Sequence, residues 1–201
     1  MSMAATGCLM LLTLTITLTA SLIFPLVYGA DIESDKQALA ALKKSLVDPW
    51  NVLSDWDVAV NPCTWNFIEC ENNRVTSVSI GMNNVGGNLV PELGGLSALV
   101  DLSIFNNMIE GTIPAELGNL QNLEVLSLSE NLLSGEIPPS LGNLRSLVFV
   151  HLDQNEFTGK VSSQIGSLPS LKLANFSGNS LCWDFWPTPN FLGNYTLCQA
   201  E

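Results

Sequence analysis

Basic side chains and histidine are scarce in this sequence. It has 7 lysines and arginines against 19 acidic residues, a single histidine, and a formal net charge of −12. Such a chain repels the phosphates of nucleic acids, so we expect no nucleic acid partner. One histidine also leaves too few nitrogen ligands for the usual zinc sites. We therefore expect neither a metal ion nor another cofactor.

Charge is missing altogether from residues 1–30, which are largely apolar. This pattern is typical of a secretory signal peptide, and Pro25 and the small Gly29-Ala30 pair favour cleavage. The bond could follow Gly29 or Ala30. An uncleaved membrane anchor is the alternative, because about 20 apolar residues can span a bilayer. No second apolar run of that length follows, so we expect a secreted protein with no membrane attachment after cleavage.

Cysteine is infrequent, with five in the chain, and the first of them falls inside the predicted signal peptide. The other four form two close pairs, Cys63 with Cys70 and Cys182 with Cys198. An even number of cysteines in a secreted chain predicts disulfides. We expect one disulfide within each pair.

A repeat of 24 residues organises the middle of the chain. Leucine-type residues recur at fixed offsets around one asparagine, one glycine and one Ile-Pro pair, in the leucine-rich repeat pattern LxxLxxLxLxxNxLxGxIPxxLGxL. Alternation of inward and outward residues predicts one short strand per repeat, and such repeats stack so that each coil buries the apolar side of the next. We expect about five strands, with the asparagines forming an internal hydrogen-bonded ladder. The asparagines stand at 83, 107, 131, 155 and 179, and the glycines at 87, 111, 135 and 159.

The segment before the repeats shows which group of leucine-rich repeat proteins this sequence resembles. SDKQALAALKKSL at 34–46 predicts a helix with a capping box from Ser34 to Gln37, and NPCTWNFIEC follows at 61–70. Together with the LxGxIP repeats, these segments resemble the somatic embryogenesis receptor kinases of plants and the small secreted leucine-rich repeat proteins related to their ectodomains. The resemblance implies an α/β solenoid: a right-handed superhelix with a short parallel concave sheet, a helical N-terminal cap and disulfide caps. The expected divisions are a signal peptide at 1–30, an N-terminal cap at 31–74, repeats at 75–181 and a C-terminal cap at 182–201.

Outward strand residues of a solenoid form a concave face that is open to a partner. Phe105, Val125 and Phe149 are informative because apolar residues gathered on one exposed face suggest a protein contact; the alternative is that they pack on one another or on glycans. The resemblance implies cap contacts at Asn66 and Phe67. The family has aromatic residues where this chain has Asn66 and Asp101, which puts an identical partner in doubt. The predicted partner-binding residues are Asn66, Phe67, Asp101, Ser103, Phe105, Val125, Ser127, Glu130, Phe149, His151 and Asp153.

A catalytic role for the histidine does not follow from the pattern. Ser127, His151 and Asp153 have the residue types of a hydrolytic triad. Outward neighbours of this kind arise automatically from the 24-residue period, and an open face offers no recognisable oxyanion hole. The sequence also contains no kinase motif. We expect no catalytic residues and no enzyme activity.

Two glycosylation sequons fit a secreted protein: Asn175-Phe-Ser and Asn194-Tyr-Thr. Asn175 would lie on the last concave strand. A glycan at Asn175 would leave the N-terminal and middle coils for a partner.

The resemblance implies a monomeric, apoplastic or cell-wall protein that binds a plant receptor kinase or its ligand complex, in defence or developmental signalling. One alternative is an inhibitor of a secreted cell-wall-degrading enzyme, since polygalacturonase inhibitors use the same repeat with about twice as many coils. A second alternative is a truncated receptor kinase ectodomain. A third is a structural role in the cell wall.

Overall fold

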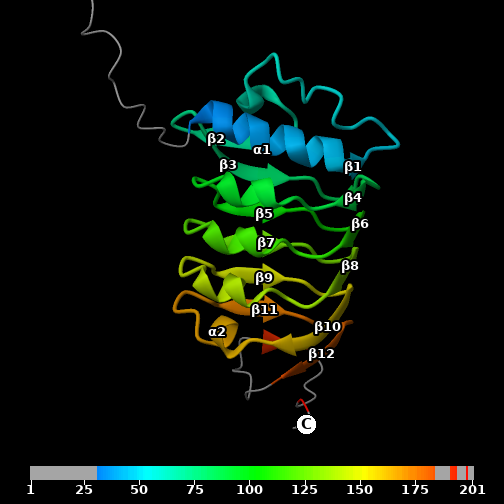
Figure 1. The fold of residues 1–201 in the computed structure, drawn as a ribbon, viewed down its shortest axis with the longest axis vertical. Coiled ribbons are helices and arrows are strands. Elements are labelled where there is room, and N and C mark those ends of the chain that lie inside the picture. Colours follow the sequence, from blue (N-terminus) through cyan, green and yellow to red (C-terminus); the bar gives the residue numbers. More distant parts are fainter. Residues whose placement is uncertain (1–30, 184–190, 194–197, 199–201) are drawn as a thin grey trace, which may run out of the picture.

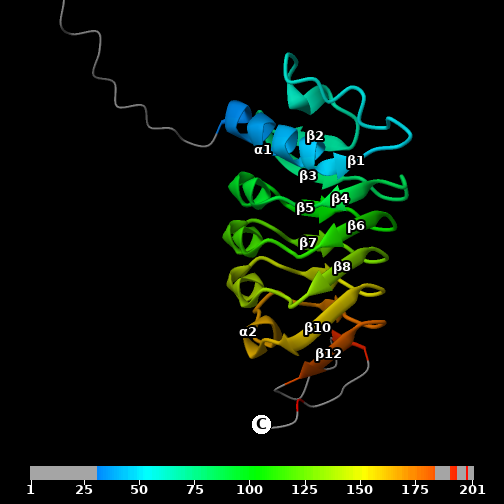
Figure 2. The same cartoon turned by 45° about the vertical axis from the view of Figure 1, so that its right-hand side comes forward.

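The computed structural model describes residues 31–183, 191–193 and 198, which stack as successive coils beneath an N-terminal helix (Figure 1). Short helices line one side of the stack and a second sheet lines the other, as the turned view makes clear (Figure 2). The predicted solenoid with a concave parallel sheet and a helical cap is confirmed. The predicted signal peptide and Asn194 lie outside the described residues.

The elements follow the repeat in order. The cap contains α1 (Ile32–Ser45), β1 (Leu46–Val47), η1 (Pro62–Thr64) and β2 (Ile68–Glu71). The concave strands are β3 (Arg74–Ser79), β5 (Asp101–Ser103), β7 (Val125–Ser127), β9 (Phe149–His151), β11 (Leu173–Asn175) and β13 (Phe191–Leu192). The strands of the second sheet are β4 (Gly86–Asn88), β6 (Met108–Gly111), β8 (Leu132–Gly135), β10 (Glu156–Val161) and β12 (Ser180–Trp183). The short helices are η2 (Pro91–Gly95), η3 (Ala115–Asn119), η4 (Pro139–Asn143) and α2 (Ser163–Gly166).

The concave sheet has seven strands in the order β13-β11-β9-β7-β5-β3-β2. Its strands are parallel from β3 to β13, and β2 joins β3 antiparallel at the N-terminal edge. Each inward residue is buried: Leu126 is 0% exposed and Leu128 is 1% exposed. The leucines of the repeat are therefore core residues, as the period predicts.

The second sheet was not predicted. It has six strands in the order β1-β4-β6-β8-β10-β12. These strands include the repeat glycines, and Gly135 has a φ of +77°, a backbone that glycine adopts without strain. Short segments such as Leu132–Gly135 become strands through main-chain pairing between coils.

The asparagine ladder is confirmed for four of the five positions. Asn131 Oδ1 accepts a hydrogen bond from Ile109 N at 3.0 Å, and its Nδ2 donates to Ile104 O at 2.7 Å. Asn107, Asn155 and Asn179 make the equivalent pair of bonds to their preceding coils. Asn83, in the first coil, donates instead to Gly81 O. The ladder satisfies buried main-chain groups that the two sheets leave unpaired at the turn between them.

The predicted start of the cap helix was wrong by a few residues. The N-cap is Asp31, whose Oδ1 accepts from Glu33 N and Ser34 N, and the helix ends at Ser45 so that Leu46 begins β1. Ser34 already lies inside the first turn, where its hydroxyl donates to Asp31 O. An aspartate at the N-cap satisfies the free amides of that turn as well as a serine would.

Aromatic side chains close both ends of the core. Trp56 and Trp65 stack at 5.3 Å between ring centroids in the N-terminal cap. Phe176 and Trp183 meet edge to face at 5.5 Å at the other end. The predicted disulfides are both present, Cys63 with Cys70 and Cys182 with Cys198.

A buried ion pair fastens the cap helix to the first repeat. Asp35 is 0% exposed and accepts from Arg74 Nε and Nη2, each at 2.8 Å, and from Val75 N at 2.9 Å. The hydrogen bond to Asp35 raises the pKa of Arg74, so the guanidinium stays charged. This pair fixes the orientation of α1 over β3.

Candidate functional site

Outward residues of the concave sheet form columns along the stack. β5, β7 and β9 pair in register, so each outward residue lies beside its equivalent in the next coil. Neighbouring strands lie about 4.8 Å apart, which lets one partner contact a whole column. The structure thus brings together most of the predicted contact residues. One column holds Asp101, Val125 and Phe149, and the other holds Ser103, Ser127 and His151.

Exposure differs along these columns. Phe149 is 38% exposed and Val125 is half-buried. Ser103 is only 7% exposed, and its hydroxyl donates to Asp101 Oδ1. Ser103 therefore presents little surface and orients the carboxylate of Asp101.

Acidic side chains border the columns at the carboxyl ends of the strands. Glu130 is exposed and accepts a hydrogen bond from Asn106 Nδ2 at 2.7 Å. Asp153 is half-buried one coil further on. Neither forms an ion pair within the part of the chain that the structure describes. The face therefore carries negative charge beside its apolar residues.

Phe105 is half-buried because its ring covers Gly81 of the preceding coil. A Cβ on Gly81 would lie 2.5 Å from Cζ of the ring, so only glycine leaves room for it. Met82, which follows Gly81, is 68% exposed, and its N–H donates to Phe105 O at 3.0 Å. Met82 is not among the predicted contacts. The sequence signal for the contact between Gly81 and Phe105 is their spacing of one 24-residue period.

The cap segment Asn66-Phe67 is held rigidly beside this end of the face. Asn66 N donates to Asp55 Oδ2 at 2.6 Å, and Asn66 O accepts from Trp56 Nε1 at 2.9 Å. Phe67 has a φ of +70° and its carbonyl accepts from Ser79 N at 2.9 Å. A bulky residue in this region costs about 1–3 kcal/mol, and such strain gathers at functional positions.

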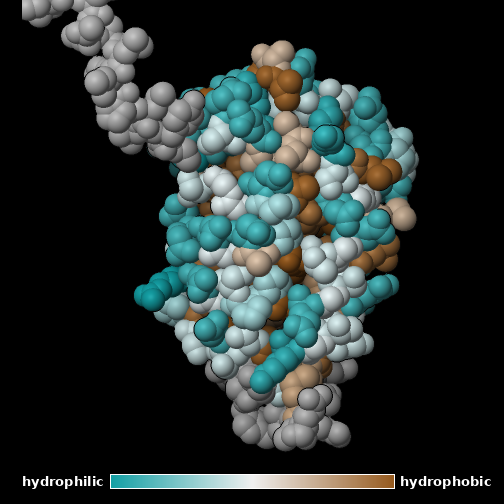
Figure 3. All heavy atoms as spheres, viewed as in Figure 1, coloured by the Kyte–Doolittle hydropathy of each residue, from teal (hydrophilic) through white to brown (hydrophobic). Residues whose placement is uncertain are grey.

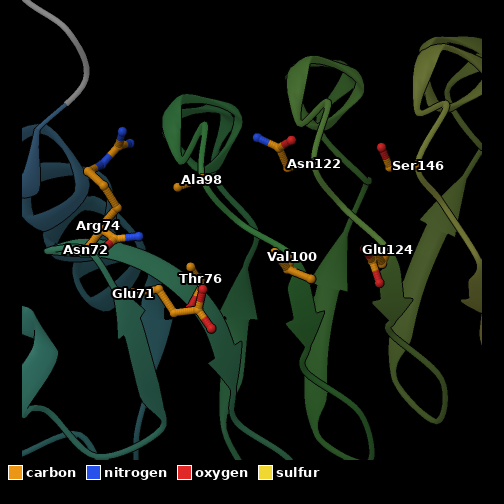
Figure 4. A pocket seen from close by; sticks show the side chains of 9 residues that line it. All are labelled: Glu71, Asn72, Arg74, Thr76, Ala98, Val100, Asn122, Glu124 and Ser146. Carbon is orange, nitrogen blue, oxygen red and sulfur yellow. The ribbon is translucent and has the colours of Figure 1, made fainter.

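A shallow groove of about 330 Å³ crosses the first coils at the amino-terminal ends of strands β3, β5 and β7 (Figure 4). The acidic Glu71 and Glu124 lie on it, and the charge of Arg74 is already paired with Asp35. Such a lining offers polar contacts at the border of the concave face rather than an enclosed site. The lining residues are Glu71, Asn72, Arg74, Thr76, Ala98, Val100, Asn122, Glu124 and Ser146.

The serine and histidine of the hypothetical triad are neighbours without being coupled. Ser127 and His151 are register partners on β7 and β9. No hydrogen bond joins their side chains, or His151 to Asp153, within the described coils. A nucleophile and its base need that contact.

Asn175 lies on β11 and is half-buried. Its Oδ1 accepts hydrogen bonds from both the main chain and the hydroxyl of Ser177. The prediction that Asn175 lies on the last concave strand was wrong, because β13 pairs with β11 and brings Leu192 beside Asn175. Glycosylation of Asn175 stays a prediction.

Among residues 31–183 and the short described segments after them, no group of three or more His, Cys, Asp or Glu side chains could hold a metal ion. The helices of that part of the chain are all too short or too polar to cross a bilayer.

Known sequences match both the cap and the repeats. The leucine rich repeat N-terminal domain matches residues 32–71, and the Leucine Rich Repeat matches 98–120 and 122–144. Leucine-rich repeat protein 1 of Arabidopsis thaliana is 47% identical over 93 residues, 45% of this chain and 41% of that protein. Polygalacturonase inhibitor 2 of the same plant is 38% identical over 104 residues, 50% of this chain and 30% of that protein. The alignments thus span less than half the length of either relative.

Solved structures agree over most of the chain. The BIR2 ectodomain of Arabidopsis thaliana is 29% identical with a TM-score of 0.75, covering 84% of this chain and 96% of that one. A chain of the BIR3–SERK2 complex from the same plant is 28% identical with a TM-score of 0.72, covering 82% and 95%. The chain is a leucine-rich repeat protein that resembles the ectodomains of plant receptor kinases.

Proposed function

We propose that this protein is a secreted binding module that joins plant receptor complexes through the N-terminal and middle coils of its concave face. Its partner is a receptor kinase ectodomain, alone or with a bound ligand, in defence or developmental signalling. The protein acts by binding and has no catalytic step of its own. The extracellular space suits its two disulfides, which form and persist in oxidising compartments.

The observation that carries this proposal is the position of Phe67. Phe67 is held at a φ of +70° while its side chain is only partly buried against the core, and strained residues of this kind gather at functional sites. Its neighbour Asn66 is clamped through both main-chain groups by Asp55 and Trp56. A rigid contact segment loses little conformational entropy when it binds a partner.

Apolar side chains continue from this cap onto the concave face. Met82 is 68% exposed and Phe149 is 38% exposed. Phe105 belongs to a coil between those of Met82 and Phe149, and its ring lies over Gly81. Aromatic residues and methionine are enriched where proteins contact one another. The other predicted contacts, among them Asp101, supply a polar border.

Similarity to known complexes supports the same role. A chain of the BIR3–SERK2 complex matches 82% of this protein, and an ectodomain of the same architecture therefore forms a heteromeric assembly. We infer that this protein also assembles with another ectodomain.

Binding to a panel of purified plant receptor kinase ectodomains tests the proposal, with the full chain secreted from insect cells and biolayer interferometry as the assay. We expect binding to at least one ectodomain, and a loss of about tenfold or more for Phe105→Ala and Phe149→Ala, as for central interface aromatics. Glu116→Ala, an exposed change on η3 at the helical side of the stack, is the matched control and should leave affinity unchanged. Equal losses for Glu116→Ala, or none for the phenylalanines, would contradict a concave site.

The second candidate is inhibition of a secreted polygalacturonase, favoured by 38% identity to polygalacturonase inhibitor 2 over 104 residues. Only 30% of that inhibitor is matched, so most of its coils have no counterpart in the alignment. A polygalacturonase assay with the purified protein decides between the two. Inhibition at nanomolar protein together with no ectodomain binding would favour the inhibitor.

A further inference from the structure

The second sheet exposes apolar side chains where its outer face should be polar. Val47 on β1 is 61% exposed, Met108 on β6 is 50% exposed and Leu132 on β8 is 44% exposed. Brown, hydrophobic surface appears along the right-hand edge of the upper half of Figure 3, where Figure 1 places β1, β4 and β6. The sheet is parallel except where β1 joins β4, and a sheet face that is not packed on the core is normally polar. Four residues are called the lateral stripe below: Val47, Gly86, Met108 and Leu132.

The strand register makes this stripe continuous. Val47 pairs with Gly86, and Gly86 pairs with Met108. A Cβ on Gly86 would lie 3.7 Å from Val47 Cβ and 3.8 Å from Met108 Cβ. Both side chains therefore stand on the same face, with bare main chain between them. Leu132 pairs with Glu110, which lies two residues after Met108. Leu132 is therefore a diagonal neighbour of Met108, and long side chains can make contact at that distance.

The same face changes character in the next coils. Glu156 and Thr158 on β10 and Ser180 on β12 are exposed there. Polar side chains therefore occupy the outer face of the sheet in these coils. The apolar residues are thus confined to the coils nearest the N-terminal cap, and contiguous apolar surface with a polar border marks a contact site.

Acidic side chains lie along the C-terminal side of the lateral stripe. Glu110 is exposed on β6, Glu156 is exposed on β10, and Glu136 follows β8 and extends over Gly159. None of these glutamates forms an ion pair with a described residue. With a net charge of −12, two copies of this chain would repel each other across such a surface. Charge complementarity selects a partner with lysine or arginine beside an apolar centre.

We propose that the lateral stripe is a second docking surface, separate from the concave face, for a basic amphipathic segment of another protein. The apolar side of that segment rests on Val47, Gly86 and Met108, and its basic residues meet the neighbouring glutamates. Since the second sheet and the concave sheet are different faces of each coil (Figure 2), both can be occupied at once. The protein then links two partners.

Two glycine substitutions provide a matched test. Gly86→Lys places a charged chain across the stripe, and its Cβ meets only ordinary contacts, the nearest at 3.4 Å from Met108 O. Gly95→Lys adds the same residue on η2, where a Cβ meets nothing within 4 Å. Neither glycine has a positive φ. The two variants therefore carry equal net charge and differ in position.

The probe is a synthetic amphipathic helix of leucine and lysine, with a leucine and glutamate peptide of the same pattern for comparison. Binding to the full secreted chain is measured by isothermal titration calorimetry in 0.15 M NaCl, after circular dichroism has shown native melting of each variant. We expect micromolar binding of the lysine peptide, a loss of about tenfold or more in Gly86→Lys, and less than about twofold in Gly95→Lys. Phe105→Ala, on the concave face, should bind as the wild type does.

Met108→Lys replaces Gly86→Lys if the latter does not melt natively. Equal binding of the lysine peptide to wild type and to the stripe variant would overturn the proposal, as would equal binding of the glutamate peptide. A wild-type dimer in sedimentation analysis that Gly86→Lys abolishes would also overturn it, because the occupant would then be a second copy.

Discussion

Replacing Asn131 with alanine should destabilise the whole stack. Asn131 is 6% exposed, and the substitution leaves Ile109 N and Ile104 O without their partners at 3.0 and 2.7 Å. Each buried group left unsatisfied costs about 1–3 kcal/mol. Two such groups give an expected loss of about 2–6 kcal/mol.

The assay is urea unfolding of the secreted protein followed by circular dichroism, with wild type and variant fitted to a common slope. Asn122→Ala is the matched control, since Asn122 makes one exposed bond, from Nδ2 to Ser97 O at 2.9 Å. Surface changes of that kind stay within about 0.5–1 kcal/mol. A loss below about 1 kcal/mol for Asn131→Ala, or equal losses for both variants, would refute the view that the ladder stabilises the stack.

Three further predictions use the same unfolding assay. Gly135→Ala should cost about 1–2 kcal/mol because φ is +77° and its Cβ would lie 3.0 Å from Thr112 Cγ2, whereas Gly95→Ala should be neutral or slightly stabilising; equal effects would contradict the backbone argument. Asp35→Ala should cost about 3–5 kcal/mol because it leaves a partly buried guanidinium unpaired, and a loss under 1 kcal/mol would show that water replaces the carboxylate. Replacing Cys63 and Cys70 with serine should cost about 2.5 kcal/mol on the chain-entropy model; unchanged stability would mean that the unfolded chain is already constrained there.

The period of the sequence was sufficient to predict the core and the ladder. Leu126, Leu128 and Asn131 are buried because a fixed repeat can bury its apolar positions only by stacking coil on coil. The same period predicted which residues share a column on the concave face, as with Val125 and Phe149. These features depend on spacing alone, which the sequence records directly.

Features that depend on contacts between distant segments were not predictable in this way. The pairing of Asp35 with Arg74 joins residues 39 apart in sequence, and either side chain could equally have been solvated. The ring of Phe105 turned onto Gly81 through a choice of rotamer, which a pattern of residue types does not encode. The second sheet arises from main-chain pairing, to which side-chain alternation over two or three residues gives no clear signal.

The asparagine ladder also determines how such a molecule can change in length. Besides bonds within its own coil, Asn131 bonds to the coil before it, at residues 22 and 27 positions earlier, and the other ladder amides repeat this offset. Duplication or deletion of a complete coil would therefore return every amide to an equivalent environment, while an indel of one residue would misalign all those downstream. The repeat region could therefore gain or lose whole coils during evolution while the aromatic pairs that close its two ends stay unchanged.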